Sequence, residues 1–255
     1  IGNQIKYLKF FCRKIEIEDL PIPKDYKNGE FVKPKEGTDD IYLTTAEIET
    51  VFKYDFTDKP YLDNARDLLI IGLNTGLRVS DFIRLDLTNV KNGNIEITTQ
   101  KAPKPVVIPI NHQIKYTLQK NGGELPRSIR EQNLNKYIKE IGEMVGFTEM
   151  VEGGKEVCIN EKEAKEKNVE KIFRKRAGVY PKFELMTSHI CRRSFATNLH
   201  EKIPTPTIMA ITGHSTEVQF LAYIKKTNAE KVEALREYYE KTEKENDLKS
   251  HLKIV

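Results

Sequence analysis

Cysteine is scarce in this sequence, and long apolar runs are missing. The 255 residues include three cysteines, which are far apart and have no second cysteine or histidine at metal-ligand spacing: Cys12, Cys158 and Cys191. This odd, scattered set excludes a disulfide framework and a cysteine-based zinc site, so we expect reduced thiols in the cytoplasm. No apolar run approaches the roughly 20 residues that span a bilayer, and no signal-peptide pattern opens the chain, so we expect no membrane partner.

An excess of charge of one sign is also missing. The chain carries 42 lysines and arginines against 38 aspartates and glutamates, a formal net charge of +4. No global basic field therefore marks the protein as a binder of polyanions, and a phosphate-binding surface would need local clustering. With 38% hydrophobic and 31% charged residues, the composition is typical of one or two folded domains with a heavily solvated surface.

The first 40 residues differ from the rest of the chain. Residues 1–20 have apolar positions spaced like one face of a helix: Ile5, Leu8, Phe11 and Cys12. Residues 21–40 hold prolines and glycines among charges, which predicts a linker. Because the chain starts with Ile1, we expect residues 1–20 to be the last helix of a largely absent upstream domain, and residues 41–228 to form the main domain.

Periodicity predicts a mainly α main domain with a small antiparallel β-sheet, an α+β fold. Thr44 and Glu47 have the spacing of a capping box, which predicts a helix start. A second helix is expected over residues 61–74, ending at Gly76. From Asn89 to Ile110 apolar residues alternate between turn signals, which predicts two or three strands.

The stretch from 150 to 180 is the least regular part of the main domain. Glu152-Gly153-Gly154-Lys155 predicts the tip of a hairpin. The charged run that follows, up to Arg176, predicts a solvated helix or an inserted segment, because runs of charge are usually solvated surface.

Residues 229–255 are predicted to form a C-terminal helix and tail. Val232, Leu235 and Tyr239 have helical spacing and are expected to be buried, whereas the chain from Glu240 is almost wholly polar. Such a tail contributes little core of its own, so we expect it to dock on a neighbouring copy.

Between Ser188 and Ile224 the sequence gathers side chains suited to breaking a phosphodiester. His189 and Arg192 are three residues apart and project from one side of a helix, His214 follows a glycine, and Tyr223 is a potential nucleophile. Arginine grips two phosphate oxygens and stays charged, and histidine manages protons. Taken singly, each signal also fits a structural role: a surface His-Arg pair, a helix-end histidine and a core tyrosine.

The joint order of motifs closely resembles the catalytic domain of the tyrosine recombinases, the phage-integrase family. The motifs are Thr75-Gly76-Leu77-Arg78-Val79-Ser80-Asp81, Thr99-Gln100-Lys101, His189-x-x-Arg192, Gly213-His214 and Tyr223. The resemblance runs from about Thr44 to Ala229. The segments around Arg192-Arg193-Ser194 and Phe220-Leu221-x-Tyr223-Ile224 are similar to integrases of conjugative transposons and other mobile elements of Bacteroides-type bacteria.

That resemblance implies six catalytic positions, Arg78, Lys101, His189, Arg192, His214 and Tyr223. The arginines would clamp the scissile phosphate, and the lysine would protonate the departing 5′ oxygen. The histidines would supply hydrogen bonds and manage protons, and the tyrosine would become linked to the 3′ phosphate. Asp81 matches the family's acidic position and is expected to orient its neighbours.

The lysine assignment has a competitor within the same turn. The family usually has threonine after its lysine, whereas Ala102 follows Lys101 here, and Lys104 is close enough in sequence to take the acid role. Motif position favours Lys101.

The resemblance implies a site-specific recombinase that cleaves and rejoins DNA through a 3′-phosphotyrosyl intermediate, for integration and excision of a mobile element. The phosphotyrosyl bond keeps the energy of the cleaved phosphodiester, so no ATP is expected. The sequence has no cluster of carboxylates of the kind that binds two metal ions, so no metal is expected either. No other cofactor is implied. Expected partners are double-stranded DNA and three further protomers joined by tail exchange. Accessory DNA-bending proteins are possible additional partners, and the expected location is the bacterial cytoplasm at the nucleoid.

Two other functions fit the same residues. A type IB topoisomerase uses a similar catalytic set and would relax a plasmid that has no specific site. An inactive DNA-binding module would form no covalent adduct, although all six positions hold competent residue types. DNA binding through a local basic groove predicts an affinity for DNA that falls steeply as the salt concentration rises.

Overall fold

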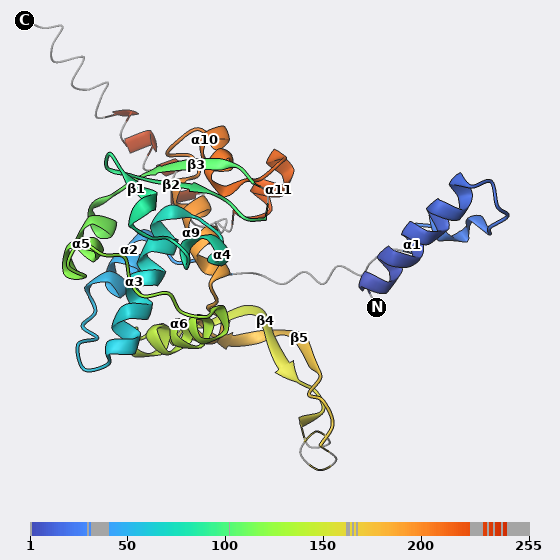
Figure 1. Ribbon diagram of the computed structural model, residues 1–255, viewed down its shortest axis with the longest axis horizontal. Helices are drawn as coiled ribbons and strands as arrows, with labels where there is room; N and C mark the ends of the chain where they lie inside the picture. Colours follow the sequence, from blue (N-terminus) through green and yellow to red (C-terminus); the bar gives the residue numbers. More distant parts are fainter. Residues whose placement is uncertain are drawn as a thin grey trace, which may run out of the picture. The chain divides into compact units, whose positions relative to one another are not determined.

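The structure is a computed structural model that divides into two compact units, Ile1–Thr38 and Asp39–Val255. It describes residues 2–29, 31, 41–101, 103–161, 164, 166, 168–224, 232, 233, 235, 236, 238–240, 242 and 243. The first unit contains helix α1 (Gly2–Ile17), which is labelled in Figure 1, and a 3-10 helix, η1 (Lys24–Lys27). The predicted linker thus includes a short helix, and its residues 30 and 32–40 lie outside the described residues. That α1 ends an absent upstream domain stays a prediction.

The second unit is mainly helical with two small antiparallel sheets, which confirms the predicted fold class. Its helices in chain order are α2 (Thr45–Lys53), α3 (Pro60–Thr75), α4 (Val79–Phe82), η2 (Leu87–Asn89), α5 (His112–Lys120), α6 (Glu131–Val145), α8 (Lys182–Leu185), α9 (His189–Leu199), α10 (Thr205–Thr212) and α11 (Glu217–Leu221). Its strands are β1 (Val90–Lys91), β2 (Asn94–Thr98), β3 (Pro105–Pro109), β4 (Met150–Cys158) and β5 (Phe173–Pro181).

Helix α3 is the centre of the core, because α2, α4, α5, α6 and α9 all pack against it. Its apolar side chains are buried around most of its circumference: Leu62, Ala65, Leu68, Leu69, Ile70, Ile71 and Leu73. Each fully buried leucine or isoleucine contributes about 1.5–3 kcal/mol to folding. Gly72 lets α9 come close, since a Cβ there would lie 2.8 Å from Sγ of Cys191.

The predicted sheet over residues 89–110 is confirmed as three antiparallel strands in the order β1-β2-β3. Ile95 pairs with Ile108 and Ile97 with Val106, and these four side chains face the core. The capping box is confirmed too: Thr44 and Glu47 exchange backbone-to-side-chain hydrogen bonds at the start of α2. The turn between β2 and β3 carries Lys101.

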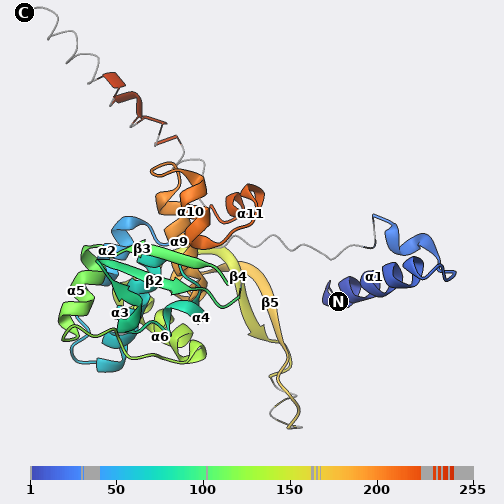
Figure 2. The same ribbon diagram turned by 45° about the horizontal axis from the view of Figure 1, so that its top comes forward.

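The expected hairpin tip at 152–155 is wrong, because these residues lie in the middle of β4. Strands β4 and β5 pair over nine residues each, and Gly153 lies directly opposite Gly178. The hairpin projects from the helical body in both views (Figures 1 and 2). Both its faces are largely solvated, so it lacks the alternation of apolar and polar residues that reveals a strand in sequence.

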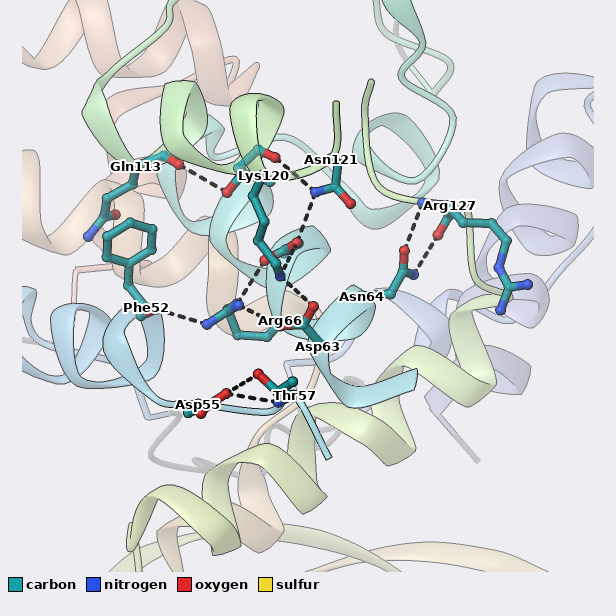
Figure 3. Close-up of polar contacts among 12 residues, drawn as sticks. Phe52, Asp55, Thr57, Asp63, Asn64, Arg66, Gln113, Lys120, Asn121 and Arg127 are labelled. Carbon is teal, nitrogen blue, oxygen red and sulfur yellow. Dashed lines mark hydrogen bonds and ion pairs between the residues drawn. The ribbon is translucent and has the colours of Figure 1, made fainter. Parts of the chain in front are cut away.

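A network of ion pairs ties α2, α3 and α5 together on the part of the unit drawn in Figure 3. Arg66 is buried, pairs with Asp63 and Asp67, and donates to the carbonyl oxygens of Phe52 and Tyr54. Lys120 reaches Asp67 from α5 at 2.8 Å. Because each buried charge has a partner, this cluster serves the scaffold and leaves the chemistry to other residues.

The expected burial of the C-terminal helix is wrong for the described residues of the tail. Those between 232 and 243 are helical, but Val232, Leu235 and Tyr239 are exposed. The rest of the predicted tail lies outside the described residues. Among the described residues, no helix is long and apolar enough to cross a membrane.

Candidate active site

The turn between α3 and α4 positions Arg78. Helix α3 ends at Gly76, whose φ of 62° reverses the chain, and Arg78 is the N-cap residue of α4. A side chain at Gly76 would collide with α9, because a Cβ there would lie 2.4 Å from Cδ1 of Phe195. Glycine thus meets two demands at once: a left-handed backbone and close packing against α9. This packing brings the half-buried Arg78 next to α9.

Arg192 extends from α9 toward the same turn. Its side chain is buried, and Nη1 donates a hydrogen bond of 3.0 Å to the carbonyl oxygen of Gly76. The other terminal nitrogen, Nη2, is also buried and has no hydrogen-bond partner among the described residues. Burial and the charge of Arg78 lower the pKa of Arg192 to about 10, against opposing effects of Tyr223 and Asp81. The group is still a cation at neutral pH.

Both guanidinium groups approach Gly213, the left-handed C-cap residue of α10. A Cβ built at Gly213 would lie 3.9 Å from Nη2 of Arg192 and 3.9 Å from Nη1 of Arg78. The charge of Arg78 acts on Arg192, and a buried donor of Arg192 has no partner among the described residues, so an anion bound at this point would be stabilised by both side chains. Because guanidinium groups fit phosphate oxygens, the geometry is that of a phosphate clamp.

His214 and Tyr223 lie together next to the arginines. The ring centroids of His214 and Tyr223 are 4.7 Å apart, with the rings inclined at 61°, and Phe220 packs on the same histidine at 5.7 Å. Burial, followed by the charges of Arg192 and Arg78, lowers the pKa of His214 to about 4. The imidazole is therefore neutral at physiological pH. The backbone oxygen of Tyr223 accepts a hydrogen bond from Thr197 of α9.

Asp81 links the arginine turn to the turn that carries Lys101. Its carboxylate is buried, and Oδ1 accepts a hydrogen bond of 2.9 Å from the backbone N–H of Gln100. Arg84 donates to the same oxygen at 3.3 Å and also to the carbonyl oxygen of Thr98 at the end of β2. The turn itself is closed by a bond from the N–H of Thr99 to the carbonyl oxygen of Lys104. These contacts hold the base of the lysine turn against α4.

Lys101 and His189 lie further out than the other predicted residues. Lys101 and its competitor Lys104 are both exposed in the turn between β2 and β3. His189 is exposed in the first turn of α9 and lines a pocket next to the β4–β5 hairpin, together with Lys155 and Lys175. Contacts and charge effects thus connect Arg78, Arg192, His214 and Tyr223, together with Asp81, whereas Lys101 and His189 are exposed.

Sequence reasoning missed Arg84 and Thr212. Arg84 lies in the turn after α4, three residues after Asp81, a spacing at which an ion pair can form. Thr212 contacts Nδ1 of His214 at 2.9 Å, and no sequence motif marks it. Its position two residues before the histidine was the one available signal.

Comparisons with known proteins identify the family and the fold. Residues 42–230 match the model of the phage integrase family. A search of curated proteins found no match. Among solved structures, a lambda integrase dimer bound to a COC′ core site is 15% identical, with a TM-score of 0.59 and coverage of 89% of this chain and 73% of that one. The Tn1549 transposon integrase in complex with circular intermediate DNA is 18% identical, with a TM-score of 0.52 and coverage of 91% and 77%.

A third solved structure, the XerA recombinase, is 17% identical, with a TM-score of 0.50 and coverage of 93% of this chain and 74% of that one. At these identities the three likenesses establish a shared fold. The family match covers most of the chain and includes all six predicted catalytic positions. The chain therefore belongs to the phage integrase family, the tyrosine-type site-specific DNA recombinases.

Proposed function

We propose that this chain cleaves and rejoins double-stranded DNA with Tyr223 as nucleophile and the scissile phosphate held between Arg78 and Arg192. The single observation that carries the proposal is the buried Nη2 of Arg192, which has no partner among the described residues and approaches Gly213 together with Nη1 of Arg78. A phosphate there would satisfy the orphaned donor and relieve the repulsion between the two guanidinium groups. Tyr223 is half-buried next to His214, which the charges of both arginines also reach.

In the proposed reaction, Oη of Tyr223 attacks phosphorus while the bond from phosphorus to the 5′ oxygen breaks. The arginines stabilise the charge of the phosphorane, and Lys101 gives a proton to the departing 5′ oxygen. His189 and His214 manage protons at the phosphate, and Asp81 keeps the lysine turn against α4. Attack by a 5′ hydroxyl of another strand reverses these steps and reseals the DNA without ATP or metal.

The biological context follows from relatives. One similar structure is a transposon integrase on circular intermediate DNA, so we assign this chain to integration and excision of a mobile element, of the Bacteroides type that the motifs resemble. The exposed Val232, Leu235 and Tyr239 support a tail that docks on a neighbouring protomer in a tetramer. We expect accessory DNA-bending proteins at such a site, and action in the bacterial cytoplasm at the nucleoid. The family match favours this reading over a type IB topoisomerase.

The test is covalent trapping. A suicide substrate, nicked next to the scissile phosphate of the parent element's attachment site, is incubated with protein in EDTA and run on a denaturing gel. We expect an adduct with the wild type and none with Tyr223→Phe. Tyr116→Phe is the matched control, because Tyr116 is an exposed tyrosine on α5 that packs on Phe52. An adduct with Tyr223→Phe, or none with the wild type, would contradict the assignment. Relaxation of a supercoiled plasmid that lacks the attachment site would favour the type IB topoisomerase.

A further inference from the structure

A pocket with a charged wall is lined by residues of α6, of the β4–β5 hairpin and of the start of α9. Its volume is about 280 Å³, below the roughly 300–1,000 Å³ of pockets that enclose a drug-sized ligand. It therefore suits one small polar group, such as a phosphate with its water. The charged side chains in the wall are four cations and two carboxylates: Lys139, Lys155, Lys175, Arg193, Glu156 and Glu184.

Two of the lysines have a carboxylate close to them. Lys155 forms an ion pair of 2.5 Å with Glu184, which leaves little net charge on this pair. Lys175 lies directly opposite Glu156 in the register of the two strands. The charges of the hairpin in this pocket are thus largely balanced.

Lys139 of α6 differs from these two lysines. Its side chain is half-buried, and no described residue provides a hydrogen-bond acceptor or a carboxylate within ion-pair distance of its Nζ. Burial, followed by the charge of Lys155, lowers the pKa of Lys139, and Glu184 and Glu156 oppose this effect only from a longer range. A partly buried cation without a close counter-ion is stabilised when an anion binds next to it.

Helix α9 connects this pocket with the proposed phosphate clamp. Arg193 lines the pocket, whereas the preceding residue, Arg192, extends to the carbonyl oxygen of Gly76 at the clamp. Successive residues of an α-helix point about 100° apart, so the pocket and the clamp lie on adjoining sides of α9. His189 in the first turn of α9 also lines the pocket. A DNA strand bound at the clamp would thus pass close to the pocket.

We propose that this pocket is a second phosphate site, in which Lys139 binds a phosphodiester of the DNA backbone other than the scissile one. The inference rests on the proposed function in one respect, the placing of the scissile phosphate between Arg78 and Arg192. The ammonium of Lys139 donates to a non-bridging oxygen of the second phosphate, and Arg193 adds its charge. A contact of this kind fixes the register of the strand at the clamp and carries no sequence information.

The first test measures the charge contact by binding alone. All proteins carry Tyr223→Phe, so that no adduct forms, and their affinity for the attachment-site duplex is titrated over a salt series. Lys139→Gln should reduce the slope of log affinity against log salt by about 0.9, the share of one phosphate contact. Lys139→Arg keeps the charge and should keep the slope. Lys136→Gln is the matched control, because Lys136 is exposed one turn earlier on α6 and does not line the pocket.

The second test locates the phosphate. In a series of duplexes, one phosphate at a time near the scissile position is replaced by a neutral methylphosphonate. We expect one position, other than the scissile one, at which this replacement weakens binding about threefold or more when Lys139 is present. The same replacement should leave the affinity of Lys139→Gln unchanged, because the contact is already lost. Such a double-substitution cycle isolates the contact between the two groups.

The outcomes separate the two proposals. An unchanged slope in Lys139→Gln, an equal loss of slope in Lys136→Gln, or no methylphosphonate whose effect depends on Lys139 overturns the second site and leaves Tyr223 as nucleophile. Dependence at the scissile phosphate alone also overturns it, since Lys139 would then belong to the clamp. A wild type that forms no adduct contradicts the proposed function, whereas the binding titrations still decide whether Lys139 contacts a phosphate.

Discussion

Arg192 donates a hydrogen bond of 3.0 Å from Nη1 to the carbonyl oxygen of Gly76, two positions before Arg78. One terminal nitrogen thereby ties α9 to the arginine turn, while Nη2 stays buried and unpaired among the described residues. The planar fork of the guanidinium lets one side chain both fix the geometry and present a donor to an anion.

Arg192→Lys should lower the rate of adduct formation by at least about a hundredfold, because a lysine ammonium cannot hold the Gly76 carbonyl and grip the phosphate in the same geometry. The measurement is single-turnover cleavage of the suicide substrate. Arg127→Lys is the control, since Arg127 is exposed before α6. A lysine variant as fast as the wild type would contradict the clamp.

Gly213→Ala should damage activity more than stability, and Gly146→Ala gives the matched comparison. Both glycines end helices with positive φ, 62° and 92°, so alanine at either site should cost about 1 kcal/mol of unfolding free energy. A Cβ at Gly213 faces both arginines, whereas one at Gly146 meets nothing within 4 Å. We expect cleavage about tenfold slower or worse in Gly213→Ala alone. Equal rates in the two variants would place the phosphate elsewhere.

Asp81→Ala should loosen the turn that carries Lys101. The substitution leaves the N–H of Gln100 without its partner, which costs about 1–3 kcal/mol in urea unfolding, and it should also slow adduct formation. Asp86→Ala removes an exposed cap of η2 nearby and should cost about 0.5–2 kcal/mol without changing the rate. If Asp81→Ala loses stability but cleaves normally, Asp81 supports the fold and does not position the lysine.

Stability should fall with acid partly because of His214. Its pKa in the folded protein is about 4, lowered first by burial and then by Arg192 and Arg78, against an ordinary value of 6.5. Between pH 4 and pH 6.5, His214 is therefore protonated in the unfolded chain but neutral in the folded protein. Its contribution to the free energy of unfolding is complete above pH 6.5 and is lost as the pH falls toward 4. Urea unfolding should show a loss of about 1 kcal/mol from near pH 7 to near pH 5, after solvent screening. His214→Gln should flatten the plot of unfolding free energy against pH in this range. An unchanged slope would show that the pKa of His214 is not lowered in the folded protein.

The β4–β5 hairpin has one face with basic side chains, where Lys155 lies opposite Arg176 and Val157 opposite Arg174. Lys175 is on the other face, opposite Glu156. If the basic face follows a DNA backbone, Arg176→Gln should reduce the slope of log affinity against log salt by about 0.9, the share of one phosphate contact. Lys175→Gln should leave the slope unchanged. Binding titrations over a salt series measure both, and equal slopes would remove the hairpin from the DNA interface.

The sequence alone determined several local elements of the fold and the family. Local periodicity predicts α3 and the three-stranded sheet, and short-range spacing predicts the Thr44 capping box, because these signals depend on neighbours along the chain. The order of motifs around Arg78, Arg192 and Tyr223 indicates the family in the same way.

Only the tertiary structure decided how those residues meet. The bond from Arg192 to Gly76 joins positions 116 residues apart, and the bond from Gln100 to Asp81 links a turn to a helix. No periodicity records such pairs, because a buried polar group is satisfied by whatever the fold brings to it. For the same reason sequence patterns misplaced the hairpin tip, because strand pairing is decided by contacts between residues that lie far apart in the chain.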